Sequence, residues 1–269
     1  MRTRVRRALP LVVLAATARL AAADVAQERA LVELAELGPS GLPAVCERAE
    51  LGMTEGELAT AWPAYQPDDG EAAYGDNRVF PVFHDDRLRA IALALHPALE
   101  PAREYAALEQ AWGKPLFASA GAVLWVWPRR RLRGSASRQF VPQIEAYAPL
   151  ADLDPDARLA VAGLTVAEAT RVLGVAASVR GDDVAFELAA SEYGEVTVRA
   201  RVARGKLVEV ALRLLYPPGA LPRLLDALRG HTGPLAQDPD RKRRWHGKRL
   251  ELDAGEHDDF GELAITRAP

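Results

Sequence analysis

The sequence is poor in residues that could cross-link the chain or anchor it to lipid. Cys46 is the only cysteine among 269 residues, so no disulfide can form within the chain. It lies too far from the N-terminus to carry a lipid anchor, and no histidine close in sequence could activate it. We therefore interpret Cys46 as a buried thiol, and we expect stability to come from the packed core.

Long hydrophobic segments are missing as well. The longest apolar run, Ala8 to Ala18, has eleven residues, whereas a transmembrane helix needs about 20. Hydrophobic residues make up 49% of the chain and charged residues 26%. This composition excludes disordered, collagen-like and coiled-coil proteins, so we predict a globular protein without a transmembrane segment.

The common catalytic motifs are also missing. The patterns Gly-x-Ser-x-Gly, Ser-x-x-Lys and His-Glu-x-x-His do not occur, and no glycine-rich loop is suited to hold a phosphate. The stretch Asp152 to Asp156 begins like a calcium loop, but Ala157 and Gly163 stand where such a loop needs glycine and glutamate. Three histidines near the C-terminus, His231, His246 and His257, match no zinc-ligand spacing. We expect no metal and no cofactor. The enzymatic alternative that remains is an active site assembled from residues that are distant in sequence.

The first 23 residues have the pattern of an export signal. Four arginines precede the apolar run, and the small residues Ala21 and Ala23 suit cleavage before Asp24. Removal of residues 1–23 takes away five arginines and no acid, so the net charge changes from −3 to −8. We predict a periplasmic or secreted, acidic protein cleaved near Ala23 that does not bind nucleic acid. The Arg6-Arg7 pair leaves twin-arginine export as the alternative to the secretory route.

Two halves of the remaining chain share one sequence pattern. Gly52–Glu57 matches Gly163–Glu168 at an offset of 111 residues, and Leu88–Leu93 matches Leu207–Leu212 at an offset of 119. Trp125 and Trp245 follow at an offset of 120. This constant order predicts a duplication. The predicted parts are a signal peptide (1–23), an N-terminal helical segment (24–50), repeat 1 (51–150) and repeat 2 (151–269).

Each repeat is predicted to fold as α-β-β-α-β-β. Thr54 with Glu57, and Thr165 with Glu168, form capping boxes that start the first helix of each repeat. The expected hairpins are 79–84 with 88–95 and 196–203 with 207–215. The expected second helices are 101–112 and 222–229, and the final strand pairs are 122–132 with 140–146 and 245–253 with 263–266. A helix over 25–37, a linker over 149–156 and an extra strand over 183–190 complete the prediction.

These units predict an α+β fold of two antiparallel sheets, each with two helices on one face. The Gly-Met-Thr and Gly-Leu-Thr openings at Gly52 and Gly163, each followed by an acid at the third helical position, resemble the small-module family that includes the small lipoprotein of the outer-membrane barrel-assembly machinery. The tandem arrangement is similar to the secreted β-lactamase inhibitor protein, which has two helix-plus-four-strand repeats. The chain departs from the lipoprotein in lacking a lipid-anchor cysteine and from the inhibitor in lacking a disulfide pair. The resemblance implies a non-catalytic binding module.

Basic clusters with tryptophans stand in the last third of both repeats. Such clusters can bind carboxylates or phosphates, provided that the guanidinium groups converge and have no acidic partners. The alternative interpretation is a solvated turn with its tryptophans in the core. The candidate ligand-binding residues are Arg129, Arg131, Trp125, Trp127, Arg243, Arg244 and Trp245.

Three functions follow from these observations. The first hypothesis is an exported, non-enzymatic module that binds an envelope or extracellular protein. The second is a binder of an anionic small molecule or envelope polymer through the paired Arg/Trp clusters. The third is an enzyme whose active site is not local in sequence.

Overall fold

A computed structural model describes most of the chain after the predicted signal peptide. The described residues are 25–26, 28–33, 35–36, 49–74, 77–84, 86–94, 99–119, 121–137, 141–241, 243–257 and 260–268. The predicted cleavage site and Cys46 lie outside the described residues. None of the described helices is long and apolar enough to cross a membrane.

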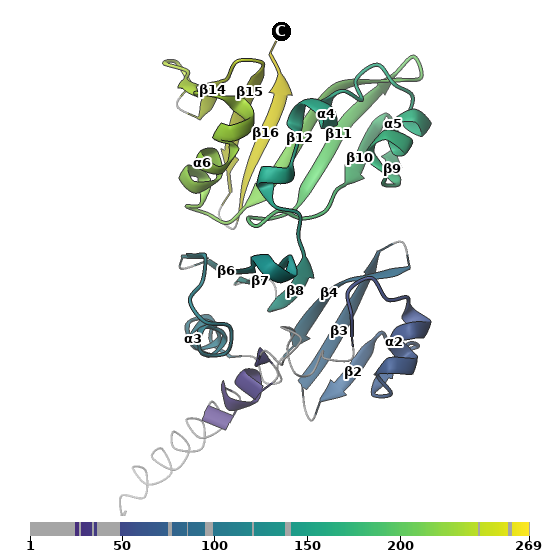
Figure 1. Cartoon of the computed structure of the whole chain (residues 1–269), viewed down its shortest axis with the longest axis vertical. Helices are drawn as coiled ribbons and strands as arrows, with labels where there is room; N and C mark the ends of the chain where they lie inside the picture. Colours follow the sequence, from purple (N-terminus) through teal and green to yellow (C-terminus); the bar gives the residue numbers. More distant parts are fainter. Residues whose placement is uncertain are drawn as a thin grey trace, which may run out of the picture. The chain divides into compact units, whose positions relative to one another are not determined.

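The two repeats contain the same elements in the same order, and the α+β class is confirmed (Figure 1). Each contributes an eight-stranded sheet, with the order β1-β2-β3-β4-β8-β7-β6-β5 in repeat 1 and β13-β14-β15-β16-β12-β11-β10-β9 in repeat 2. Read from the other edge, the second order is the same as the first. Every strand pair with a described register is antiparallel within these sheets.

Repeat 1 begins with α2 (Glu55–Ala61) and continues through four strands to α3 (Pro101–Trp112) and four further strands. The first four strands are β1 (Tyr65–Gln66), β2 (Glu71–Tyr74), β3 (Asn77–His84) and β4 (Arg87–Ala94). The second four are β5 (Phe117–Ala118), β6 (Ala122–Trp127), β7 (Leu132–Ser137) and β8 (Gln143–Ala146).

Repeat 2 has the corresponding helices α5 (Val166–Leu173) and α6 (Leu221–Thr232), preceded by the short α4 (Pro155–Leu159). Its first four strands are β9 (Ala177–Arg180), β10 (Asp183–Glu187), β11 (Val196–Ala203) and β12 (Lys206–Tyr216). The second four are β13 (Ala236–Gln237), β14 (Arg244–His246), β15 (Leu250–Glu256) and β16 (Gly261–Arg267).

The predicted order α-β-β-α-β-β is too short, because four strands follow each helix. The expected strand 122–132 is divided by the 3-10 turn Pro128–Arg130, since proline removes a backbone donor and fixes φ. The expected strand 245–253 is divided at Gly247. The extra strand expected over 183–190 is β10, and repeat 1 has its counterpart in β2.

Both capping boxes form as the sequence predicts. The Thr54 backbone N–H donates to Glu57 Oε2 at 2.7 Å, and the Glu57 N–H donates to Thr54 Oγ1 at 3.3 Å. Thr165 and Glu168 repeat this geometry at 2.8 and 3.3 Å. The hydrogen bond from the threonine backbone stabilises the carboxylate and lowers the pKa of each glutamate.

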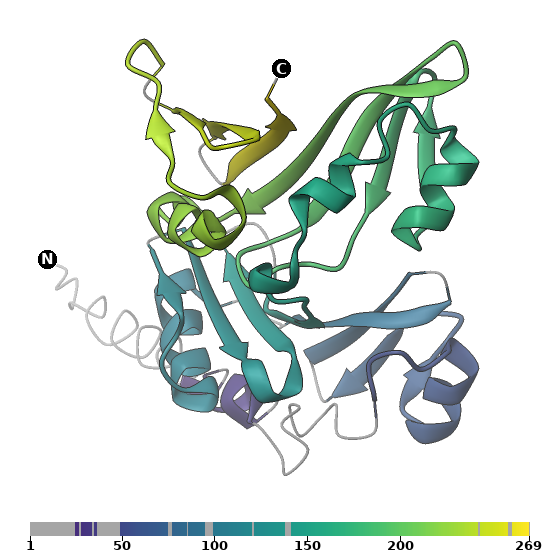
Figure 2. The same ribbon diagram turned by 45° about the horizontal axis from the view of Figure 1, so that its top comes forward.

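The core of repeat 2 lies between its sheet and its helices, which cover one face of the sheet (Figures 1 and 2). Strand residues such as Phe186, Val198 and Leu212 are fully buried there, with Leu224 and Leu228 from α6. Along β11 the buried side chains alternate with exposed or half-buried ones, as expected where only one sheet face is covered.

The predicted linker 149–156 is part of the folded core. It contains the 3-10 turn Leu150–Asp152 and the start of α4, which Asp154 caps by accepting from the Ala157 N–H at 3.1 Å. Leu150 and Leu159 are each 1% exposed and belong to the repeat 2 core. The polar composition suggested a linker, whereas the burial of Leu150 in the repeat 2 core makes this stretch part of the fold.

The N-terminal segment packs against the second helix of repeat 1. The described residues between Val25 and Ala35 are helical, and Leu31 and Ala35 are fully buried. The Trp112 indole N–H donates to the Ala35 carbonyl oxygen at 2.7 Å. In repeat 2, α6 has an equivalent contact with its own preceding segment, because His231 Nε2 lies 3.0 Å from the Leu150 carbonyl oxygen.

By contacts, the chain divides into two compact units. One is Met1–Pro115 with Val141–Gln143, and the other is Leu116–Phe140 with Ile144–Pro269. Strands β9 to β12 lie entirely within the second unit.

Candidate binding face of repeat 2

Strands β9 to β12 present an uncovered face of alternating charged and small side chains. In β11, Val196, Val198 and Ala200 point into the core, so that Arg199 and Arg201 between them point to the opposite face. The same period in β10 buries Val184 and leaves the outward side chains accessible. The helices cover only the core side, so this face is open to solvent.

The centre of this face is hollow, with a volume of about 550 Å³. Ala185 and Ala211 lie directly opposite Arg199 on the two neighbouring strands, and Ser178 lies opposite Ala185 on β9. Small side chains therefore surround the Arg199 guanidinium on both sides. Longer charged residues line the hollow at its rim: Arg180, Asp183, Glu187, Arg201, Glu209 and Arg213.

Two of the three rim arginines form ion pairs, whereas Arg180 at the rim and Arg199 at the centre form none among the described residues. Arg201 forms an ion pair with Glu209 at 3.0 Å, and Arg213 forms one with Glu262. Within the described part of the chain, Arg199 has no ion pair and no hydrogen bond from its side chain, and it is exposed. Its charge is therefore available to a partner group.

A β-bulge in β12 lies at Glu209, the residue that forms the ion pair with Arg201. Arg199 pairs with Ala211 but Arg201 pairs with Val208, so β12 contains one extra residue at this point. Glu209 has φ of 53°, in the left-handed region that costs a residue with a Cβ roughly 1–2 kcal/mol. Repeat 1 has the same register shift between Val82 and Phe83. The bulge is thus a feature of both repeats, but the left-handed glutamate belongs to the face of repeat 2.

The arginines predicted from the sequence as a ligand site already have carboxylate partners in three of four cases. Arg131 pairs with Asp152 at 2.6 Å, Arg243 pairs with Glu256 at 2.5 Å, and Arg244 pairs with Glu251. Arg129 lies in the turn between β6 and β7, without such a pair among the described residues. The condition that the guanidinium groups be unpaired is therefore not met by the cluster as a whole.

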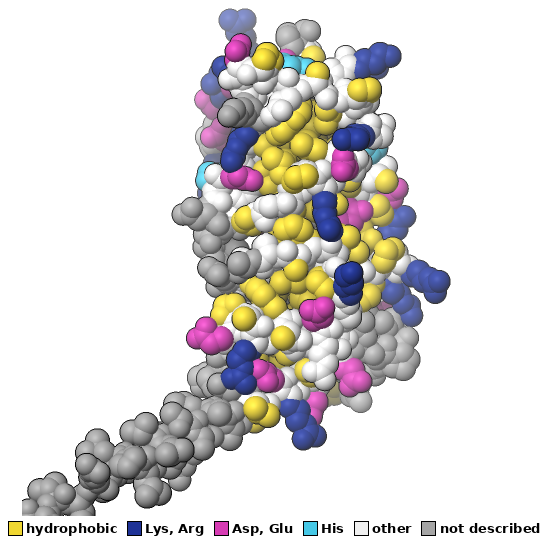
Figure 3. All heavy atoms as spheres, turned by 90° about the vertical axis from the view of Figure 1, so that its left-hand side faces the viewer, with side chains coloured by type: hydrophobic (Ala, Val, Ile, Leu, Met, Phe, Trp, Pro, Cys, Tyr) yellow, Lys and Arg dark blue, Asp and Glu magenta, His cyan; other side chains and the backbone are white. Residues whose placement is uncertain are grey.

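The predicted tryptophans are mainly packing residues. Trp125 is 1% exposed in β6, where it lies opposite Gly134, and Trp127 at the end of β6 is half-buried. Trp245 is half-buried against the repeat 2 core. It also lines a groove of about 510 Å³ beside Leu225, Arg229 and Leu235. Figure 3 shows a face of the molecule on which hydrophobic side chains lie between charged ones.

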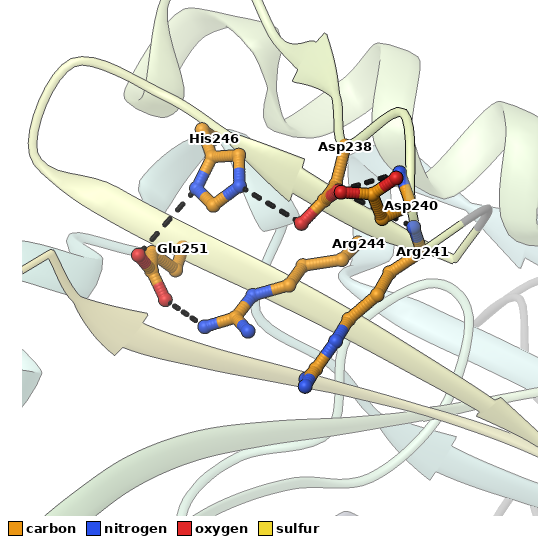
Figure 4. A network of polar contacts seen from close by, with 6 residues as sticks. All are labelled: Asp238, Asp240, Arg241, Arg244, His246 and Glu251. Carbon is orange, nitrogen blue, oxygen red and sulfur yellow. Dashed lines mark hydrogen bonds and ion pairs between the residues drawn. The ribbon is translucent and has the colours of Figure 1, made fainter.

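Arg244 belongs to a polar network that ties β13 to β15 (Figure 4). His246 lies between Asp238 and Glu251, with nitrogen to oxygen distances of 3.5 and 3.4 Å. Asp238 accepts from the backbone N–H of Asp240 at 2.9 Å, and this bond is the main cause that lowers the pKa of Asp238. The network holds the local chain together.

Titratable groups do not converge on a reaction centre in the part of the chain that the structure describes. No three His, Cys, Asp or Glu side chains there are grouped closely enough to hold a metal ion. Among the described carboxyl groups, Glu104 on α3 has a raised pKa: burial raises it from 4.5 to about 7. Comparison of the chain with known protein families, curated proteins and solved structures finds no match.

The sequence did not single out the hollow face. Its signal was present in β11, where Arg199 and Arg201 alternate with buried residues. The small residues that make the hollow come from β9, β10 and β12, and their positions opposite Arg199 depend on strand register.

Proposed function

We propose that this protein is an exported, non-enzymatic module that binds another protein through the hollow face of β9 to β12. The observation that supports it most directly is the exposed Arg199 between Ala185 and Ala211, at the centre of a hollow of about 550 Å³. Arginine is enriched among residues that dominate protein interfaces, and a pocket beside it can receive a partner side chain.

The surroundings of Arg199 favour a protein over a simple anion. The rim carries both signs of charge, since Asp183, Glu187 and Glu209 stand among the arginines. A mixed rim around a small-residue centre suits the polar periphery and buried anchor of a protein interface. We infer that a carboxylate side chain of the partner pairs with Arg199, because this guanidinium lies at the centre of the hollow and, like Arg180 at the rim, forms no ion pair among the described residues.

The anionic-ligand alternative through the Arg/Trp clusters has less support. The carboxylates on Arg131, Arg243 and Arg244 compete with any added anion for the same donors. A ligand would have to break these pairs before it could bind.

Capture with matched baits tests the proposal. Residues 24–269 are immobilised as the unaltered chain, as Arg199→Ala, as Ala185→Trp and as Arg171→Ala, and are exposed to the source organism's envelope fraction and culture medium. Ala185→Trp fills the hollow without changing charge. Arg171 is an exposed arginine on α5, on the helix side of the sheet, and serves as the control.

We expect one or more proteins to bind the unaltered chain and Arg171→Ala but not Ala185→Trp. The affinity of a captured protein should fall roughly 30-fold with Arg199→Ala, the effect of losing an interface arginine at a hot spot. Equal binding to all four baits would place the interface elsewhere. The absence of any captured protein would contradict the proposed binding role.

A further inference from the structure

Strand β9 is the longest of the four strands that end the two sheets. Sheet edges present unpaired backbone groups, and proteins commonly protect them with proline or with very short edge strands. Three of the edges follow this rule with strands of two residues that have a proline within two positions. These are β1 before Pro67, β5 after Pro115, and β13 between Pro234 and Pro239.

The β9 edge has neither form of protection. It has four residues, Ala177–Arg180, and no proline or lysine lies between Gly174 and Gly181. Val179 on this strand is 54% exposed, one of the most exposed large hydrophobic side chains among the described residues. An apolar residue at an uncovered edge favours pairing with another strand.

The hydrogen-bond pattern shows which backbone groups of β9 face outward. The Val202 N–H donates to Asp182 and the Leu188 N–H donates to Val196, so even-numbered residues of β10 bond with β11. Odd-numbered residues of β10 therefore bond with β9, where their partners are Arg180 and Ser178. It follows that the N–H and C=O groups of Val179 and Ala177 point away from the sheet.

This register is self-complementary under a two-fold axis. If Val179 lies opposite Val179 of a second copy in an antiparallel pair, the two residues exchange backbone hydrogen bonds with their outward groups. Ser178 then lies opposite Arg180 of the second copy on the hollow side of the sheet, and no two like charges are directly opposed. Each exposed valine packs against the other.

We propose that the protein forms a two-fold dimer by pairing β9 with β9 of a second copy. The interface is isologous, because the same surface occurs on both partners. Dimerisation would join the two hollow faces along one continuous sheet. The proposal is independent of the proposed function, since it does not use Arg199.

The oligomeric state of residues 24–269 tests the dimer directly. Sedimentation equilibrium over a range of concentrations should show a reversible monomer–dimer equilibrium for the unaltered chain. Val179→Lys should raise the dimer dissociation constant at least tenfold, because an edge lysine blocks strand pairing. Val82→Lys is the matched control, since Val82 is an exposed valine (44%) in an interior strand of repeat 1, and Arg199→Ala should also leave dimerisation unchanged.

Disulfide cross-linking through an introduced cysteine gives a second test. It detects the proposed dimer directly and does not require a variant that weakens the interface. In a Cys46→Ser background, Val179→Cys places one thiol opposite its symmetry mate, with a Cα separation of about 5.5 Å that permits a disulfide. Mild oxidation should yield a covalent dimer from Val179→Cys and not from Val82→Cys. A chain that stays monomeric at every concentration and forms no specific Val179→Cys dimer would overturn the proposal, as would a dimer that Val179→Lys leaves intact.

Discussion

The ion pair between Arg133 and Glu145 offers a sharp test of how burial changes the contribution of a charge pair. Arg133 Nε and Nη2 both donate to Glu145 Oε1, at 2.8 and 2.5 Å. The two side chains are only 6% and 16% exposed. Replacement of Arg133 by Met keeps most of the apolar volume but removes the two Arg133 donors from a largely buried carboxylate.

Removal of one partner from a buried pair costs about 3–5 kcal/mol. We therefore expect Arg133→Met to lower the free energy of unfolding by about this amount, measured by urea unfolding at pH 7. The matched control is Arg201→Met. Arg201 pairs with Glu209 at a similar distance of 3.0 Å, but the side chains are 53% and 65% exposed, so the expected cost is below about 1 kcal/mol.

A second substitution separates two effects on the free energy of unfolding: the cost of the buried Glu145 charge and the cost of lost packing. Adding Glu145→Leu to Arg133→Met replaces both members of the pair by apolar residues and should recover most of the lost stability, since buried pairs are commonly replaceable in this way. Equal effects of Arg133→Met and Arg201→Met would refute the reasoning. So would a double variant no more stable than Arg133→Met alone.

Three further predictions concern single sites. Thr165→Ala removes the N-cap of α5 and should cost about 1 kcal/mol of unfolding free energy in chemical denaturation. Leu31→Ala should cost about 2–5 kcal/mol by the same assay, because Leu31 is fully buried; a loss below about 1 kcal/mol would mean that the N-terminal segment is not docked. The pKa of Glu104 is raised in the folded state, so folding binds a proton between pH 4.5 and about 7. Stability from this group is present below pH 4.5 and is lost as the pH rises to about 7, and a stability–pH profile of Glu104→Gln should lack this decline.

The predictions that the structure confirms depended on local signals. The capping boxes at Thr54 and Thr165 form with the expected reciprocal bonds, and the expected helix 101–112 has the bounds of α3. Strand β11 likewise has the bounds given by its alternating pattern. In each case the residues that specify the element lie within a few positions of one another, so the sequence records them directly.

The errors arose where distant residues decide the outcome. The short strands β1 and β13 have two residues each, too few to show a period, and they exist because a neighbouring strand supplies their hydrogen bonds. Arg131 was assigned to a candidate anion site because local sequence does not show its ion pair. Its carboxylate partner, Asp152, lies 21 residues away in sequence. Net charge and local composition cannot reveal such a pairing.

The sequence by itself determined the duplication, the two-helix and sheet content of each repeat and the buried stripe of each regular element, because these follow from periodicity and capping. Tertiary structure decided which arginines form ion pairs with carboxylates and which, such as Arg199, do not. Arg199 lies on β11, but the alanines that leave it uncovered come from β10 and β12. Strand register places those residues together, and register is fixed only when the whole sheet buries its apolar face.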